Sequence, residues 1–255
     1  SIIKLIEDKM NLEHDIQEAG VQMILLVEDS IRFYSSILPN LYNYILEQSK
    51  NFSQEALNRH AATMRMRGRP KVVLARTYEE AQKLYDKYSD NTLGVISDAR
   101  FPLKSAAKAF GNEVMPEEKP KHRTDTFGRE KCPDAGLQLF RYIRKNDPFV
   151  PLIIESSESE NRAKAEAEGF RFVDKNSKKM SVDLRRLMEE HMGFGDFIFR
   201  DPKTHEEIMR IHSLKELQDN IFNIPNDSML YHISRNHMSR WLYARATFPV
   251  SALLQ

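Results

Sequence analysis

Two apolar segments of the chain end in carboxylates that could bind a metal ion. The unbroken apolar run 23–27 is followed directly by Glu28 and Asp29, and the run 93–97 ends at Asp98. Two adjacent carboxylates repel each other unless a cation or a proton lies between them, and carboxylate oxygens suit a hard cation such as Mg²⁺. The plain alternative is that these acids are solvated strand ends.

Two further segments end in side chains that could contact a phosphoryl group. The run 151–155 leads to the hydroxyl of Ser156, and the run 170–174 leads to Lys175. A continuous apolar run such as 23–27 is typical of a strand buried on both faces of a parallel sheet, and these segments are interpreted as further strands. Ligands of open α/β sheets bind at the carboxyl ends of such strands. We therefore expect an acid pair, a single acid, a hydroxyl and a lysine to meet at one edge.

Helical patterns alternate with the strands and predict an α/β fold. Ser30, Thr77 and Ser213 are expected N-caps, and Gly169 is an expected C-terminal helix glycine. Pro39 is expected to kink or interrupt the first core helix, and Ser53 to cap a second one. The expected strands are 21–27, 71–75, 93–98, 151–157 and 170–175, and the expected helices are 30–52, 53–66, 78–88, 158–169 and 178–192.

The patterns divide the chain into three predicted parts. Residues 1–20 are expected to form a helix and a mostly polar linker, although Leu12 and Ile16 could extend the helix. Residues 21–192 form the strand-and-helix domain, with a charged insertion at about 103–131 that we interpret as a short helix and a mobile loop. Residues 193–255 are predicted to be a small connector of one hairpin and several helices.

The order of side chains at the strand ends resembles the receiver domain of two-component response regulators. That resemblance implies a flavodoxin-like (CheY-like) doubly wound sheet of five parallel strands, to which the sequence pattern adds the small C-terminal α+β extension. It implies that Asp98 accepts a phosphoryl group, that Lys175 pairs with a phosphoryl oxygen, and that Ser156 donates a hydrogen bond to another. The chain would then be a regulatory phosphoacceptor rather than a complete enzyme.

The same resemblance implies a magnesium site. Glu28 and Asp29 would hold Mg²⁺, and Asp98 together with the backbone carbonyl of Arg100 would complete the ligand set. After Asp98, the family carries an apolar residue and a proline, then an acid and a glycine. Phe101 and Pro102 match the first pair here, but the acid and the glycine come only after the insertion, in the run 134–137.

Some residues depart from the family's pattern and keep alternatives open. Asn176 stands where receivers carry a proline after the lysine, and Phe172 cannot donate the hydroxyl hydrogen bond that a tyrosine could. A degenerate receiver that serves as a phosphorylation-independent interaction scaffold is therefore the second hypothesis. A phosphohydrolase is disfavoured, because Arg100 stands where such enzymes carry a second aspartate.

The C-terminal run 231–245 mixes apolar, basic and aromatic residues. With the insertion, it makes the chain similar to the N-terminal regulatory part of phosphoenolpyruvate synthase-like (pyruvate phosphate dikinase-related) proteins. That resemblance implies an attached or partner catalytic domain, which Trp241 and Tyr243 would anchor. It also implies a sensor histidine kinase or a small phosphodonor as the source of the phosphoryl group. The chain contains no glycine-rich nucleotide loop.

Composition narrows the remaining functional classes. The 255 residues carry 38 basic and 37 acidic side chains, a balance that argues against a general nucleic-acid binder. No apolar run approaches the roughly 18 residues of a membrane span. Cys132 is the only cysteine, which excludes an internal disulfide and favours a reducing, cytoplasmic location.

Overall fold

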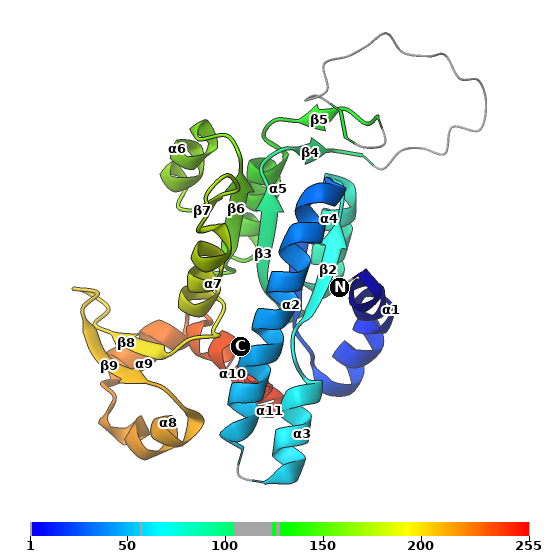
Figure 1. The fold of residues 1–255 in the computed structure, drawn as a ribbon. Helices are drawn as coiled ribbons and strands as arrows, with labels where there is room; N and C mark the ends of the chain where they lie inside the picture. Colours follow the sequence, from blue (N-terminus) through cyan, green and yellow to red (C-terminus); the bar gives the residue numbers. More distant parts are fainter. Residues whose placement is uncertain (1, 57, 105–123, 126–127, 255) are drawn as a thin grey trace.

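A parallel sheet of five strands forms the centre of the structure, a computed structural model that describes residues 2–56, 58–104, 124–125 and 128–254 (Figure 1). The strand order is β2-β1-β3-β6-β7. This is the flavodoxin-like doubly wound order, so the predicted fold class is confirmed. The strands are β1 (Met23–Val27), β2 (Lys71–Ala75), β3 (Thr92–Asp98), β6 (Leu152–Ser156) and β7 (Arg171–Asp174).

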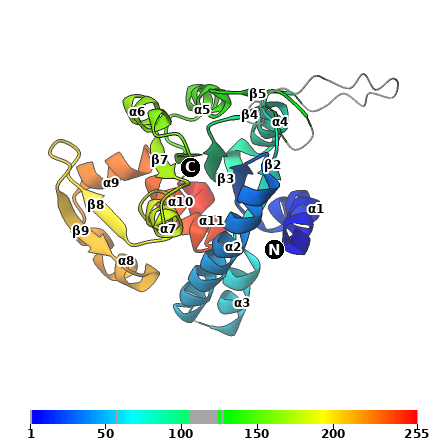
Figure 2. The same cartoon turned by 45° about the horizontal axis from the view of Figure 1, so that its top comes forward.

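Helices cover both faces of this sheet, which explains why the strands are apolar without alternation (Figure 2). All five residues of β1 are buried. On one face, Tyr85 and Phe140 belong to the core formed with α4, α5 and α6. On the other, Leu38 and Met188 belong to the core formed with α2 and α7. These helices are α2 (Ile31–Gln54), α4 (Tyr78–Tyr88), α5 (Ala135–Asn146), α6 (Glu160–Ala167) and α7 (Met180–His191).

The first core helix is longer than the sequence predicted. α2 runs through Pro39 and past Ser53, so neither residue divides it. The next helix, α3 (Arg59–Arg67), begins instead at Asn58, whose side chain accepts a 2.8 Å hydrogen bond from the Ala61 amide. Proline removes one helical hydrogen bond, but packing of the buried face of α2 against the sheet outweighs that loss.

Three of the other expected helix caps are confirmed. Thr77 accepts a hydrogen bond from the Glu80 amide, and Ser213 accepts one from the Glu216 amide at the start of α8 (Leu214–Asn220). Gly169 follows the end of α6 with a φ of +76°, a conformation that favours glycine. Ser30 is at the N-cap of α2, but its side chain makes no cap hydrogen bond.

The N-terminal segment is one helix, α1 (Ile2–Ala19), so the expected polar linker is wrong and the extended helix is right. Leu12 is buried in the core, and Ile16 packs against it. Asp8 is 1% exposed and accepts a 3.1 Å hydrogen bond from the amide of Val72 in the edge strand β2. α1 therefore covers an edge that would otherwise expose unpaired backbone groups.

The C-terminal residues form the expected hairpin and helices. Phe199, Ile211 and Trp241 lie in a separate core cluster, whereas Tyr243 and Ala244 belong to the core that α2 and α7 form with the sheet. The extension is thus packed against the sheet domain. Its elements are β8 (Phe197–Arg200), β9 (Glu207–Ile211), α8 (Leu214–Asn220), α9 (Asn226–Ile233), α10 (His237–Ala244) and α11 (Phe248–Leu253).

The predicted insertion begins and ends in a short antiparallel pair, β4 (Phe101–Pro102) and β5 (Lys131–Cys132). The helix and loop predicted between them fall mostly on residues 105–123 and 126–127, which lie outside the described residues. Within the described ranges, no helix combines the length and the apolar character needed to cross a membrane.

Candidate functional site at the carboxyl edge of the sheet

Glu28, Asp98 and Lys175 meet at the carboxyl edge of the sheet, on the face covered by α2 and α7. Leu26 and Ile96 belong to the core of that face. Side chains two residues apart along a strand point to the same side, so Glu28 and Asp98 continue these two rows at the strand ends. Lys175 stands in the same relation to Val173 of β7.

Three carboxylates form the acidic part of this site. One oxygen of each of Glu28, Asp29 and Asp98 lies within 4.8 Å of the others. Glu28 and Asp29 are fully buried. Burial, with repulsion from Asp98, raises the pKa of Glu28 to about 8, and burial also raises the pKa of Asp29. The protein therefore concentrates carboxyl groups where water cannot solvate their charged forms.

Lys175 is the cation that contacts two of these acids. Its Nζ donates a hydrogen bond to Glu28 Oε2 and lies 2.9 Å from Asp98 Oδ1. The same Nζ lies 4.6 Å from the ring centre of Phe33 in α2. Desolvation lowers the pKa of Lys175, but the surrounding carboxylates outweigh this effect and raise that pKa above its usual value. Lys175 is therefore a fixed positive charge beside Asp98.

Asp98 is the most accessible acid of the cluster, with a side chain 14% exposed. Its Oδ1 accepts a 2.8 Å hydrogen bond from the Ala99 amide and also contacts Lys175. Among the described residues, no donor contacts Oδ2. A Cβ on Gly136 would lie 2.3 Å from the Asp98 carbonyl oxygen, so only glycine lets α5 approach here. Gly136 therefore lies beside Asp98 in space, although the insertion separates the two residues in the sequence.

Ser156 and Arg100 lie at the same edge with partners of their own. Ser156 Oγ accepts hydrogen bonds from the Glu158 amide at 3.1 Å and from Asn161 Nδ2 at 2.9 Å. The guanidinium of Arg100 lies 3.0 Å from Glu158 and so joins the loops after β3 and β6. The hydroxyl predicted to contact a phosphoryl group therefore points toward Asn161 in this structure.

Asn176 and Phe172, the two residues that depart from the receiver pattern, have contacts of their own in the structure. Asn176 Nδ2 donates a 2.9 Å hydrogen bond to the Ser157 carbonyl, and the Asn176 amide donates to Asp174 Oδ1 at 2.8 Å. These bonds fix the loop after Lys175 in the absence of proline. Phe172 packs against the guanidinium of Arg162 at 4.7 Å from the ring centre.

The sequence interpretation missed two charged residues at this site. Glu155 is fully buried and pairs in backbone register with Asp98, and neither of its carboxylate oxygens has a hydrogen-bond partner among the described residues. Its position two residues after Ile153 was a usable signal, because period two places it on the face of Asp98. Lys131 Nζ lies 2.7 Å from Asp29 Oδ2. No local pattern marks this lysine within the charged insertion.

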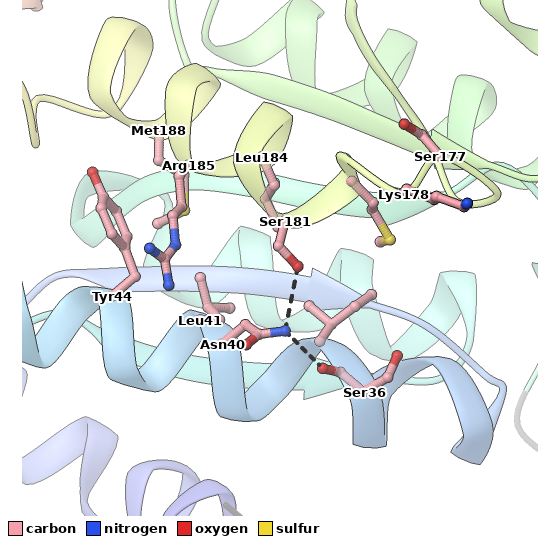
Figure 3. Close-up of a pocket in the computed structure, with 12 residues that line it drawn as sticks. Ser36, Asn40, Leu41, Tyr44, Ser177, Lys178, Ser181, Leu184, Arg185 and Met188 are labelled. Carbon is pink, nitrogen blue, oxygen red and sulfur yellow. Dashed lines mark hydrogen bonds between the residues drawn. The ribbon is translucent and has the colours of Figure 1, made fainter.

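A groove lies beside the site, between α2 and α7 (Figure 3). Its volume is about 230 Å³, and Leu41 and Leu184 contribute apolar lining. Asn40 Nδ2 spans it with a 3.3 Å hydrogen bond to Ser181 Oγ, drawn as a dashed line in the figure. The lining includes Ser177, two residues after Lys175 in the chain, but none of the acids of the cluster.

The donor set fits a magnesium ion. Asp29 Oδ1 is buried and accepts no hydrogen bond from the described residues, whereas Asp29 Oδ2 contacts Lys131 Nζ. Buried polar atoms normally have a partner, and unpartnered carboxylate oxygens are ligands for a hard divalent cation. Among the described residues, the only group of three or more potential ligands is Glu28, Asp29 and Asp98.

Comparison with known proteins adds two similar solved structures. No protein-family model matches the sequence, and no curated protein matches it significantly. A response regulator receiver domain protein from Clostridium thermocellum is 18% identical, with 67% of this chain and 94% of that chain covered and a TM-score of 0.37. A two-component transcriptional regulator AraC from Clostridium phytofermentans is 14% identical, with coverage of 68% and 93% and a TM-score of 0.37. The fold assignment rests on the strand order of the sheet.

Proposed function

We propose that this chain is a receiver-type regulatory domain that accepts a phosphoryl group on Asp98 in the presence of Mg²⁺. The proposal rests on the residues that surround the Asp98 carboxylate. Its carboxylate contacts Lys175 and lies within 4.8 Å of Glu28 and Asp29. It does so at the carboxyl edge of a doubly wound sheet, where ligands of such sheets bind.

The proposed reaction is a displacement at phosphorus. Asp98 Oδ2 forms a new bond to the phosphorus atom of the donor, and the bond from phosphorus to the donor breaks, so that the donor leaves with the electron pair. Lys175 pairs with a phosphoryl oxygen, and Ser156 turns its hydroxyl from Asn161 toward another.

The metal site follows from the same cluster. Glu28, Asp29, Asp98 and the carbonyl of Arg100 would hold Mg²⁺, which would supply positive charge to neutralise the phosphoryl oxygens. In its absence, the carboxylates of the protein repel the negative donor. The acid cluster therefore makes phosphoryl acceptance dependent on a divalent cation.

The partners that we propose come from the sequence resemblance. A sensor histidine kinase or a small phosphodonor would supply the phosphoryl group. The output would be an attached or partner enzyme of the phosphoenolpyruvate synthase-like class, regulated through a shift between two packings of the domain. The resemblance of the insertion and of residues 231–245 to that class supports this output.

The test is incubation with acetyl phosphate and Mg²⁺, followed by measurement of the intact mass. We expect the wild type to gain one phosphoryl group and Asp98→Asn to gain none. Asp134→Asn is the matched control, because Asp134 is half-exposed at the start of α5 and outside the cluster; it should gain the group. A wild type that gains nothing would favour the scaffold function, and a gain in Asp98→Asn would place the acceptor elsewhere.

A further inference from the structure

We propose that Lys131 is a built-in cation that competes with Mg²⁺ for Asp29 and so lowers the affinity of the site for metal. This inference rests on the proposed function, because it concerns the same metal site. It assigns the predicted insertion a role that its sequence does not reveal: its last residue supplies a positive charge to the acidic cluster.

The contact itself is direct. Lys131 Nζ lies 2.7 Å from Asp29 Oδ2, an oxygen that Mg²⁺ would use or closely approach. The Asp29 side chain is fully buried and that of Lys131 is 16% exposed. A short ion pair with a buried carboxylate is screened little by water. The ammonium group therefore supplies the counter-charge that a metal ion would otherwise supply to Asp29.

The backbone holds Lys131 in this place. β5 pairs with β4 so that Lys131 lies opposite Pro102 and Cys132 lies opposite Phe101. Phe101 is fully buried in the core, and it follows Asp98 closely in the chain. The pairing thus ties the position of Lys131 to the segment that follows Asp98.

A second set of contacts holds the chain just before Lys131. The Arg129 amide donates a 2.7 Å hydrogen bond to Asp125 Oδ1, and Arg129 Nε donates to Asp125 Oδ2 at 2.6 Å. The β4–β5 pairing and the contacts between Arg129 and Asp125 therefore hold the backbone around Lys131 and keep its side chain beside Asp29.

The two lysines of the site differ in what they can do. Lys175 is 1% exposed and contacts both Glu28 and Asp98, so it cannot leave without exposing two buried acids to each other. Lys131 contacts Asp29 alone and is partly exposed, so its ammonium group can move into water. A divalent ion and an ammonium group that share one carboxylate repel each other. Metal binding must then either displace the Lys131 ammonium group from Asp29 or be weakened by that repulsion.

The experiment compares the affinity for Mg²⁺ among charge variants by titration calorimetry, with Mn²⁺ electron paramagnetic resonance as a second readout. Removing one positive charge about 5 Å from a divalent ion should tighten binding about tenfold even at the dielectric constant of water. We expect Lys131→Met to show this gain and Lys131→Arg to keep the wild-type affinity. Lys164→Met is the matched control, because Lys164 pairs with Asp134 outside the cluster and its loss should change nothing.

Each result separates this proposal from the proposed function. Equal affinity for Mg²⁺ in Lys131→Met and wild type, in a protein that acetyl phosphate still phosphorylates, would overturn the competitor role alone. Weaker binding in Lys131→Met would overturn it as well, and would make Lys131 a residue that orients Asp29. If neither protein bound metal and neither gained a phosphoryl group, both proposals would fail, because removal of the lysine would not have opened a site.

Discussion

At the scale of single residues, the site is dominated by buried carboxyl groups. Glu155 is the clearest case, because it is fully buried and its carboxylate oxygens have no hydrogen-bond partner among the described residues. Burial raises its pKa to about 7, Lys175 opposes the shift, and Asp98 adds to it. An isolated buried carboxylate is costly when ionised, so this group tends to hold a proton in the folded protein.

The first prediction concerns the pH dependence of stability in metal-free protein. Between the ordinary glutamate pKa of 4.5 and the folded value of about 7, folded Glu155 holds a proton that the unfolded chain has released. The free energy of unfolding should therefore fall as pH rises through this window, by on the order of 3 kcal/mol. Glu155→Gln cannot titrate, so its stability relative to wild type should rise by that amount between pH 4.5 and pH 8.

Urea unfolding at several pH values in the presence of a chelator measures this difference. Subtracting the wild-type profile removes the contribution of titrating groups that behave alike in both proteins. A difference between the two proteins that stayed constant with pH would show that Glu155 is already ionised when folded.

At the scale of elements, α1 closes the open edge of the sheet through one buried acid. Asp8 accepts the Val72 amide of β2, lies 2.8 Å from Lys4 Nζ, and lies 3.8 Å from Lys71 Nζ. Lys71 Nζ also lies 2.6 Å from Oδ2 of Asp15, which is further along α1. This arrangement links α1 to β2 by hydrogen bond and charge together.

Asp8→Ala should destabilise the protein by about 3 kcal/mol, because it leaves the buried Val72 amide without its partner and removes a buried counter-charge from beside Lys71. Glu7→Ala is the matched control. Glu7 is exposed, and its 3.5 Å contact with Lys4 should contribute less than about 1 kcal/mol. Equilibrium denaturation in urea distinguishes the two. Equal small effects for both variants would mean that α1 is held by its apolar face alone.

The elements also show how far sequence reasoning reached. Mostly apolar segments predicted the five strands, and the polar residues at the ends of four of them predicted the site edge. The extent of α1 and the passage of α2 through Pro39 depend on tertiary packing, which local propensity does not contain. Lys131 reaches Asp29 only through the pairing of β4 with β5, a contact between segments separated by the insertion.

At the scale of the whole molecule, the C-terminal extension is tied to the sheet domain by Arg245. This residue is 2% exposed and donates hydrogen bonds to the carbonyls of Gly193 at 2.7 Å and Gly195 at 3.0 Å. Its guanidinium lies 3.8 Å from the ring centre of Trp241 and 4.2 Å from that of Phe52 in α2. Gly193 and Gly195, at the predicted boundary between these two parts, are therefore bound by a residue of the extension.

We expect the sheet domain and the extension to unfold together. Trp241 is the only tryptophan and lies in the extension, so its fluorescence reports that part, whereas far-UV circular dichroism reports all helices. The two urea transitions should coincide with one midpoint. A fluorescence transition at lower urea than the dichroism transition would show that residues 193–254 are a separately folding unit.

The central claim is that Asp98 accepts a phosphoryl group, and the most direct test is to locate that group in the chain. The protein is treated with acetyl phosphate and Mg²⁺, reduced with borohydride to convert any acyl phosphate into a stable alcohol, digested, and analysed by peptide mass spectrometry. The account predicts homoserine at position 98 and at no other aspartate. Homoserine at another position, or none in a protein that binds Mg²⁺ at the cluster, would contradict it.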